Sequence, residues 1–135
     1  MITLATAIAL PLALQAAPVA SDAPAQEQAA SAITSLDDLP IEQTTAARCG
    51  IAFAVVEGMQ GAGHPGATAL PSMVESGGRE FFVQAMVRLM DETGLSREAL
   101  KDLVNLEVQA HMADQGEAAL QMVPGCLLLK DATGA

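Results

Sequence analysis

The sequence is poor in the residues on which many binding sites depend. It has no tryptophan or tyrosine, three phenylalanines, two histidines, and six basic residues against sixteen acidic ones. Nucleic-acid binding needs a basic stripe and often aromatic stacking platforms, so we expect no nucleic-acid partner. The net charge of −10 also disfavours an anionic membrane surface. It permits a basic protein partner, although an acidic, solvated surface is the more common explanation of such a charge.

Charge is missing altogether from residues 1–20, where an apolar run of Ala, Leu, Ile and Thr contains Pro11. This run and the small residues after it predict a secretory signal peptide. Two features depart from the pattern: no Lys or Arg precedes the run, and a cut after Ala16 would place Leu14 at the −3 position. The alternative is an uncleaved membrane anchor, against which Pro11 and Gln15 argue. We expect a periplasmic or secreted protein whose mature domain does not insert into a membrane.

Only two cysteines are present, Cys49 and Cys126. In an oxidising compartment they predict a single structural disulfide. Closing a loop of this length would stabilise the fold by about 4 kcal/mol, which is comparable with the whole stability of a small domain. The alternative is a reactive thiol or a redox pair. A CxxC motif or a basic neighbourhood would support it, but the cysteines are far apart and only Arg48 is close in sequence.

Composition divides the remaining chain into two parts. Residues 21–38 are rich in Ala, Pro, Gln, Ser and Asp, which predicts a disordered linker. Residues 39–135 are rich in helix-forming residues and poor in strand formers. We therefore predict one all-α domain of three to four helices tied by the disulfide. The competing interpretation of residues 51–56 as a buried strand is disfavoured by the length of the apolar segment and by the lack of a partner strand.

Apolar periodicity and glycine positions predict the helices of this domain. The first begins near Pro40, is apolar all round and stops within residues 58–63. A capping-box pattern at Ser72 opens a second helix that runs strongly over 79–93. In it Phe82, Ala85, Met86, Leu89 and Met90 form the buried stripe, with Phe81 at its edge.

A tight corner at Gly94 and Ser96 leads to a third helix, predicted over 97–115. A short fourth helix, predicted over 117–123, is halted by Pro124 and Gly125. These two residues would deliver Cys126 back to the first helix.

Residues 61–66 match the dinucleotide-binding pattern GxGxxG. That motif requires a strand before the glycines and a helix directly after them. Here the glycines follow a predicted helix and the fifth position is Pro65. We interpret the segment as a helix terminator and loop, and we predict no cofactor.

Two sequence patterns suggest a metal or small-molecule site. Glu107, His111 and Asp114 fall at helical spacing and are the candidate metal ligands, although His111 also continues an apolar stripe, which favours a packed histidine. Seven methionines suggest a copper site or an adaptable groove. They coincide with predicted core positions, which favours core packing.

No arrangement of residues indicates catalysis. Neither histidine has a nucleophile and an orienting acid at a recognisable spacing, so we predict that the protein is not an enzyme. The leading hypothesis is a non-enzymatic periplasmic interaction protein of the chaperone, inhibitor or immunity kind. The first alternative is a small-molecule or metal-binding module that uses the Met-rich interior and His111. The second is a secreted hydrolase, for which no site is evident. The sequence identifies no specific partner, ligand or oligomeric state.

Overall fold

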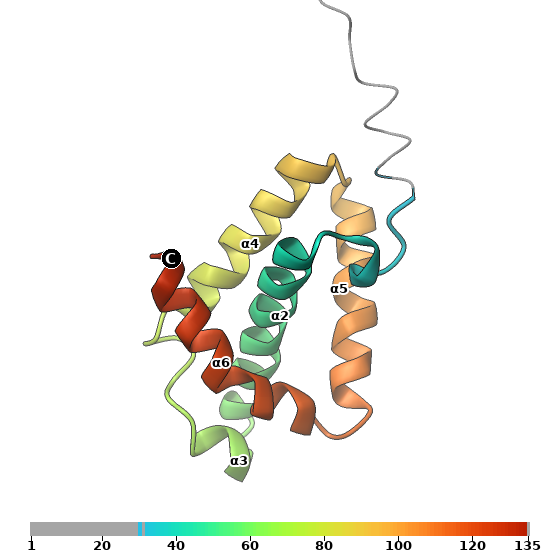
Figure 1. The fold of residues 1–135 in the computed structure, drawn as a ribbon. Coiled ribbons are helices and arrows are strands. Elements are labelled where there is room, and N and C mark those ends of the chain that lie inside the picture. Colours follow the sequence, from blue (N-terminus) through green and yellow to red (C-terminus); the bar gives the residue numbers. More distant parts are fainter. Residues whose placement is uncertain (1–29, 31, 135) are drawn as a thin grey trace, which may run out of the picture.

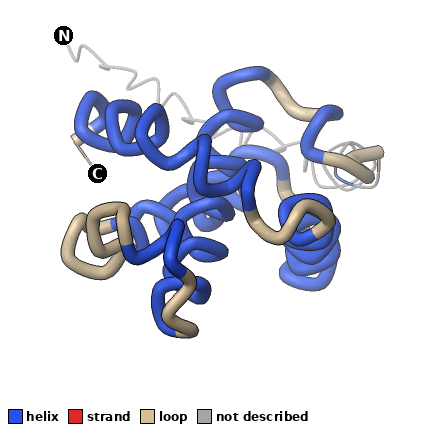
Figure 2. The backbone as a smooth tube through the Cα atoms, turned by 90° about the horizontal axis from the view of Figure 1, so that it is seen from below, coloured by secondary structure: helices blue, strands red, loops and turns tan. Residues whose placement is uncertain are grey.

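The structure, a computed structural model, describes residue 30 and residues 32–134. The predicted signal peptide and most of the predicted linker lie outside these residues. Within them the fold is all-α, made of helices and turns without a strand (Figures 1 and 2). In chain order the elements are η1 (Leu36–Asp38), α2 (Ile41–Gly61), α3 (Pro65–Thr68), α4 (Gly78–Thr93), α5 (Arg97–Met112) and α6 (Glu117–Thr133).

Helix α2 is the centre of the domain, as the sequence predicts. The other helices surround it, with α5 on one side and α6 on the other (Figure 1). Ile51, Phe53 and Val56 are completely buried. The ring of Phe53 meets that of Phe81 on α4 edge to face, with centroids 5.6 Å apart. Residues 49–53, 55 and 56 are all buried, which explains why this part of α2 has no polar stripe.

The predicted disulfide is present. Cys49 on α2 and Cys126 on α6 are bonded, with their Cα atoms 5.2 Å apart, and both side chains are buried. The bond joins the central helix to the last described helix across 77 residues of sequence. Among the described residues, no helix has the length and apolarity to cross a membrane.

The corner between α4 and α5 follows the sequence prediction. Gly94 adopts a left-handed conformation with φ 72°, and its N–H donates to the carbonyl of Met90. Ser96 then caps α5 by accepting a hydrogen bond from the N–H of Ala99. Leu95 lies between the two helices and is buried. A glycine that accepts positive φ and a serine that caps the next helix define this corner.

The start of α4 differs from the prediction. The Ser72 hydroxyl accepts a hydrogen bond from Glu75, but the residues that follow form turns and α4 begins at Gly78. The predicted order of the two phenylalanines is also wrong, because Phe81 is buried and Phe82 only half-buried. A β-carbon on Gly50 of α2 would lie 3.1 Å from the Cα of Phe82. This close backbone contact places the Phe82 ring beside the helix contact and leaves Phe81 to fill the core.

The predicted stop at Pro124 is wrong. Helix α6 continues through it to Thr133. Pro124 and Gly125 are exposed, whereas Val123 and Cys126 on the inner face are buried. A proline inside a helix costs about 3 kcal/mol. Burial of the inner face and the disulfide offset that cost.

The predicted third helix is shorter than expected, because α5 ends at Met112. Gln115 and Gly116 have φ values of 61° and 86° and form the turn into α6. At the other end, the packed structure extends before residue 39. Leu36 of η1 is buried, and the Ser35 hydroxyl caps η1 by accepting a hydrogen bond from Asp37.

Candidate functional site

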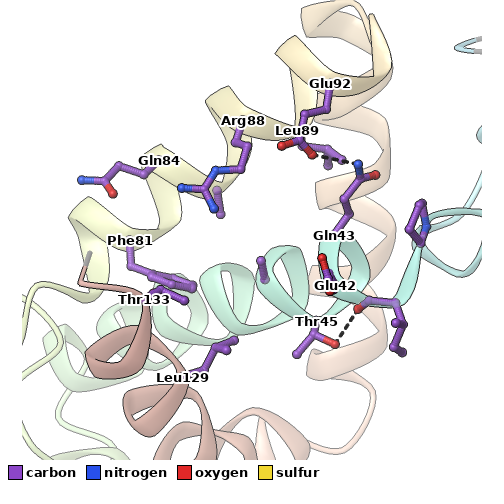
Figure 3. Close-up of a pocket in the computed structure, with 14 residues that line it drawn as sticks. Glu42, Gln43, Thr45, Phe81, Gln84, Arg88, Leu89, Glu92, Leu129 and Thr133 are labelled. Atoms are coloured by element: carbon purple, nitrogen blue, oxygen red, sulfur yellow. Dashed lines mark hydrogen bonds between the residues drawn. The ribbon is translucent and has the colours of Figure 1, made fainter.

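A groove lies between α2, α4 and α6. Its volume is 520 Å³, and it opens to solvent over the N-terminal half of α2 (Figure 3). The size lies within the range of 300–1,000 Å³ that is common for ligand sites. Apolar side chains from all three helices line it: Ile41, Ala46, Phe81, Ala85, Leu89 and Leu129.

The groove exists because small side chains lie where the helices face one another. Ala46 on α2 and Ala85 on α4 both line it. They leave open the space that larger side chains would fill. Phe81, Ala85 and Leu89 follow one another at i, i+4 and i+8, so one face of α4 forms a continuous wall. Leu129 and Thr133 of α6 form the facing wall.

Polar side chains surround the apolar floor. Glu42 and Glu92 are both exposed and line the groove from α2 and α4. Gln43 Nε2 donates to Glu92 Oε2 at 2.8 Å and so links the two helices across the groove (Figure 3). Arg88 lines the same wall of α4 and is exposed. An apolar floor with a mixed-charge rim resembles the anatomy of a protein interface.

The three candidate metal ligands, Glu107, His111 and Asp114, do not come together. Glu107 Oε1 lies 3.7 Å from His111 Nε2, but the carboxylate of Asp114 accepts the backbone N–H of Ala118 at the start of α6. Among the described residues, no three His, Cys, Asp or Glu side chains are close enough to hold a metal ion. His111 is buried, and its Nε2 has no hydrogen-bond partner within the described part of the chain. His111 therefore serves packing, Glu107 forms an ion pair with Arg48, and the three residues do not form a chelate.

Glu107 instead belongs to a structural ion-pair network. Arg48 of α2 donates to Glu107 of α5 at 3.1 Å and to Asp37 of η1 at 2.9 Å. Burial alone would lower the pKa of Arg48, but the hydrogen bond to Asp37 and the charges of Glu107 and Asp37 together raise it. Arg48 therefore holds three elements together by charge and hydrogen bonding.

No methionine of the described part of the chain lines the groove. Met59, Met73 and Met86 are buried in the core, and the exposed Met112 belongs to α5. Alanine, leucine and phenylalanine provide the apolar floor of the groove instead. Met59, Met73 and Met86 fill core space, as the favoured interpretation of core packing predicts, whereas Met112 does not.

Sequence reasoning did not find the groove. Gln84 and Arg88 fall outside the predicted buried stripe of their helix, and in the structure both are exposed and line the groove. A usable signal was present in Ala46 and Ala85, two small residues on apolar helix faces. Finding the groove also required knowing that these two faces meet.

Three comparisons were made with known proteins. Protein-family models, curated proteins and solved structures gave no match to the chain.

Proposed function

We propose that this protein is an exported, non-enzymatic interaction module that binds an apolar segment of another protein in the groove between α2, α4 and α6. The groove is the observation that carries the proposal. It combines an apolar floor with a polar rim at a size suited to a few side chains. An interface of this kind places its anchoring apolar contacts at the centre and polar groups at the edge.

The disulfide and the charge-free N-terminal run support the proposal that the protein is exported. A disulfide persists in an oxidising compartment and is rare in the cytosol. In such a compartment, a small acidic helical domain with an open apolar groove suits a chaperone, inhibitor or immunity role. Each of these roles requires binding and no catalysis.

Site-specific photo-crosslinking tests the proposal. A photoreactive amino acid replaces Gln84, which is exposed and lines the groove, or Gln109, which is exposed on α5 away from it. We expect a discrete covalent adduct to a protein of the same compartment from position 84 and none from position 109. Ala46→Trp, which fills the groove, should abolish the adduct. Equal adducts from both positions, or an adduct that survives Ala46→Trp, would rule out the groove as the binding site.

A further inference from the structure

The length of the groove and the kind of secondary structure around it define the shape of its occupant. On α4 the wall runs from Phe81 to Glu92, a rise of about 16 Å at 1.5 Å per residue. A peptide that pairs with a sheet needs an exposed strand edge, and the described residues contain only helices and turns. The other common mode lays an amphipathic helix into an apolar groove. About three helical turns fit along this wall.

Charge is distributed unevenly along the groove. One end carries the exposed carboxylates of Glu42 and Glu92, whereas Leu129 and Phe81 line the other end (Figure 3). Arg88 lies one helical turn before Glu92 on α4. A cationic side chain of an occupant is therefore attracted to the carboxylate end and repelled near Arg88.

The overall charge of the chain also favours a cationic partner. Three of its six basic residues are already engaged with its own carboxylates: Arg48 with Asp37 and Glu107, Arg79 with Glu57, and Lys130 with Asp131. The net charge of −10 adds an attraction for cationic partners along the whole groove. Such a field speeds the encounter with cationic surfaces and slows the encounter with anionic ones.

We propose that the occupant is one amphipathic helical segment of another protein, about three turns long, with apolar side chains facing the groove and a Lys or Arg at the end that meets Glu42 and Glu92. This inference rests on the proposed function, because it names the chemistry of the partner for the same groove. The apolar contacts hold the segment, and the carboxylate end sets its direction.

The test titrates the ¹⁵N-labelled, oxidised protein with two synthetic 14-residue amphipathic peptides, one of Leu and Lys and one of Leu and Glu in the same pattern. We expect the Leu/Lys peptide to shift the amide signals of residues that line the groove and the Leu/Glu peptide to bind at least tenfold more weakly. An exposed ion pair changes affinity by up to about fivefold. Glu42→Gln with Glu92→Gln should therefore weaken the Leu/Lys peptide about fivefold, and Arg88→Gln should tighten it.

The matched control is Glu98→Gln with Asp102→Asn, which removes two exposed charges on α5 outside the groove. It should change affinity less than twofold. If both double variants weaken binding equally, only net charge matters and the inference about the carboxylate end fails, while the proposed function stands. If neither peptide shifts the groove signals, both fail. Groove signals that shift with protein concentration alone would identify a second copy as the occupant and overturn the inference.

Discussion

The two sides of α2 are built differently. On the α5 side, Arg48 bridges Asp37 and Glu107, and Leu100 and Leu103 are buried. On the groove side, α4 and α6 leave 520 Å³ open above apolar side chains. A domain this small has little core to spare, so a gap beside its central helix is costly unless a partner fills it. The comparison shows that buried leucines and an ion pair hold α5 to α2, whereas the disulfide and the Phe53–Phe81 contact hold α6 and α4 to α2 around an opening that the proposed partner would fill.

The largest expected effect comes from removing the disulfide, which fixes α6 as a wall of the groove. Cys49→Ala with Cys126→Ala, or reduction of the native protein, should lower the free energy of unfolding by about 4 kcal/mol. Urea unfolding of oxidised and reduced samples measures the loss. Amide exchange should show α6 losing protection before α5 does. Simultaneous loss in both helices would contradict the difference between the two sides.

Two neighbouring alanines give the next largest contrast. Ala47 is 1% exposed and lies in the core, whereas Ala46 lines the groove. Ala47→Leu should destabilise the protein by about 1–3 kcal/mol, because a closely packed site cannot accept the added volume. Ala46→Leu should change stability by less than about 0.5 kcal/mol, because the groove has room. Thermal unfolding of the two variants side by side checks the prediction, and equal losses would mean that the groove is not open.

Removal of a charged side chain should give a smaller difference in the free energy of unfolding between the two sides. Glu107→Ala leaves Arg48 without its partner on α5 and should cost about 1–2 kcal/mol. Arg88→Ala removes a groove residue that is exposed and should cost less than about 0.5 kcal/mol. Chemical denaturation of both variants measures the difference. A larger loss for Arg88→Ala would show that the groove wall is part of the stabilising structure.

The smallest effect concerns the cap of η1 on the α5 side. Backbone N–H groups of Thr34 and Ser35, helped by the Thr34 hydroxyl, lower the pKa of Asp38 below its usual 3.8. A depressed folded pKa means that the charge stabilises the fold above pH 3.8 and that this contribution disappears as the pH falls through the folded value. Asp38→Asn should therefore lower the Tm at pH 7 and match the parent protein in strong acid. An equal deficit at both pH values would mean that shape, rather than charge, makes the cap.

Much of the fold follows from local chemistry. Gly94 and Ser96 fix the corner between α4 and α5, because positive φ and a side-chain cap are properties of those residues themselves. The disulfide follows from there being only two cysteines. Each of these predictions required knowledge of a few residues and none of the helix arrangement.

The sequence predictions are wrong where tertiary contacts determine the local structure. The sequence predicts that the last helix ends at Pro124, but α6 continues through it. The buried Val123 and Cys126 on either side keep the helix intact. The order of Phe81 and Phe82 depends on how closely α4 approaches Gly50. The groove depends on which faces of three helices meet. Periodicity identifies the apolar faces, but the distances between them come from packing.

The position of Cys126 late in the chain also sets how early the disulfide can close. Helix α2 contains the most buried side chains and is made first, yet its covalent partner emerges 77 residues later. At 5–20 residues per second, that interval is about 4–15 s. Throughout it, α2 has no α6 to pack against. The covalent link between the centre of the domain and its last described helix therefore closes only after nearly all of the described chain has been made.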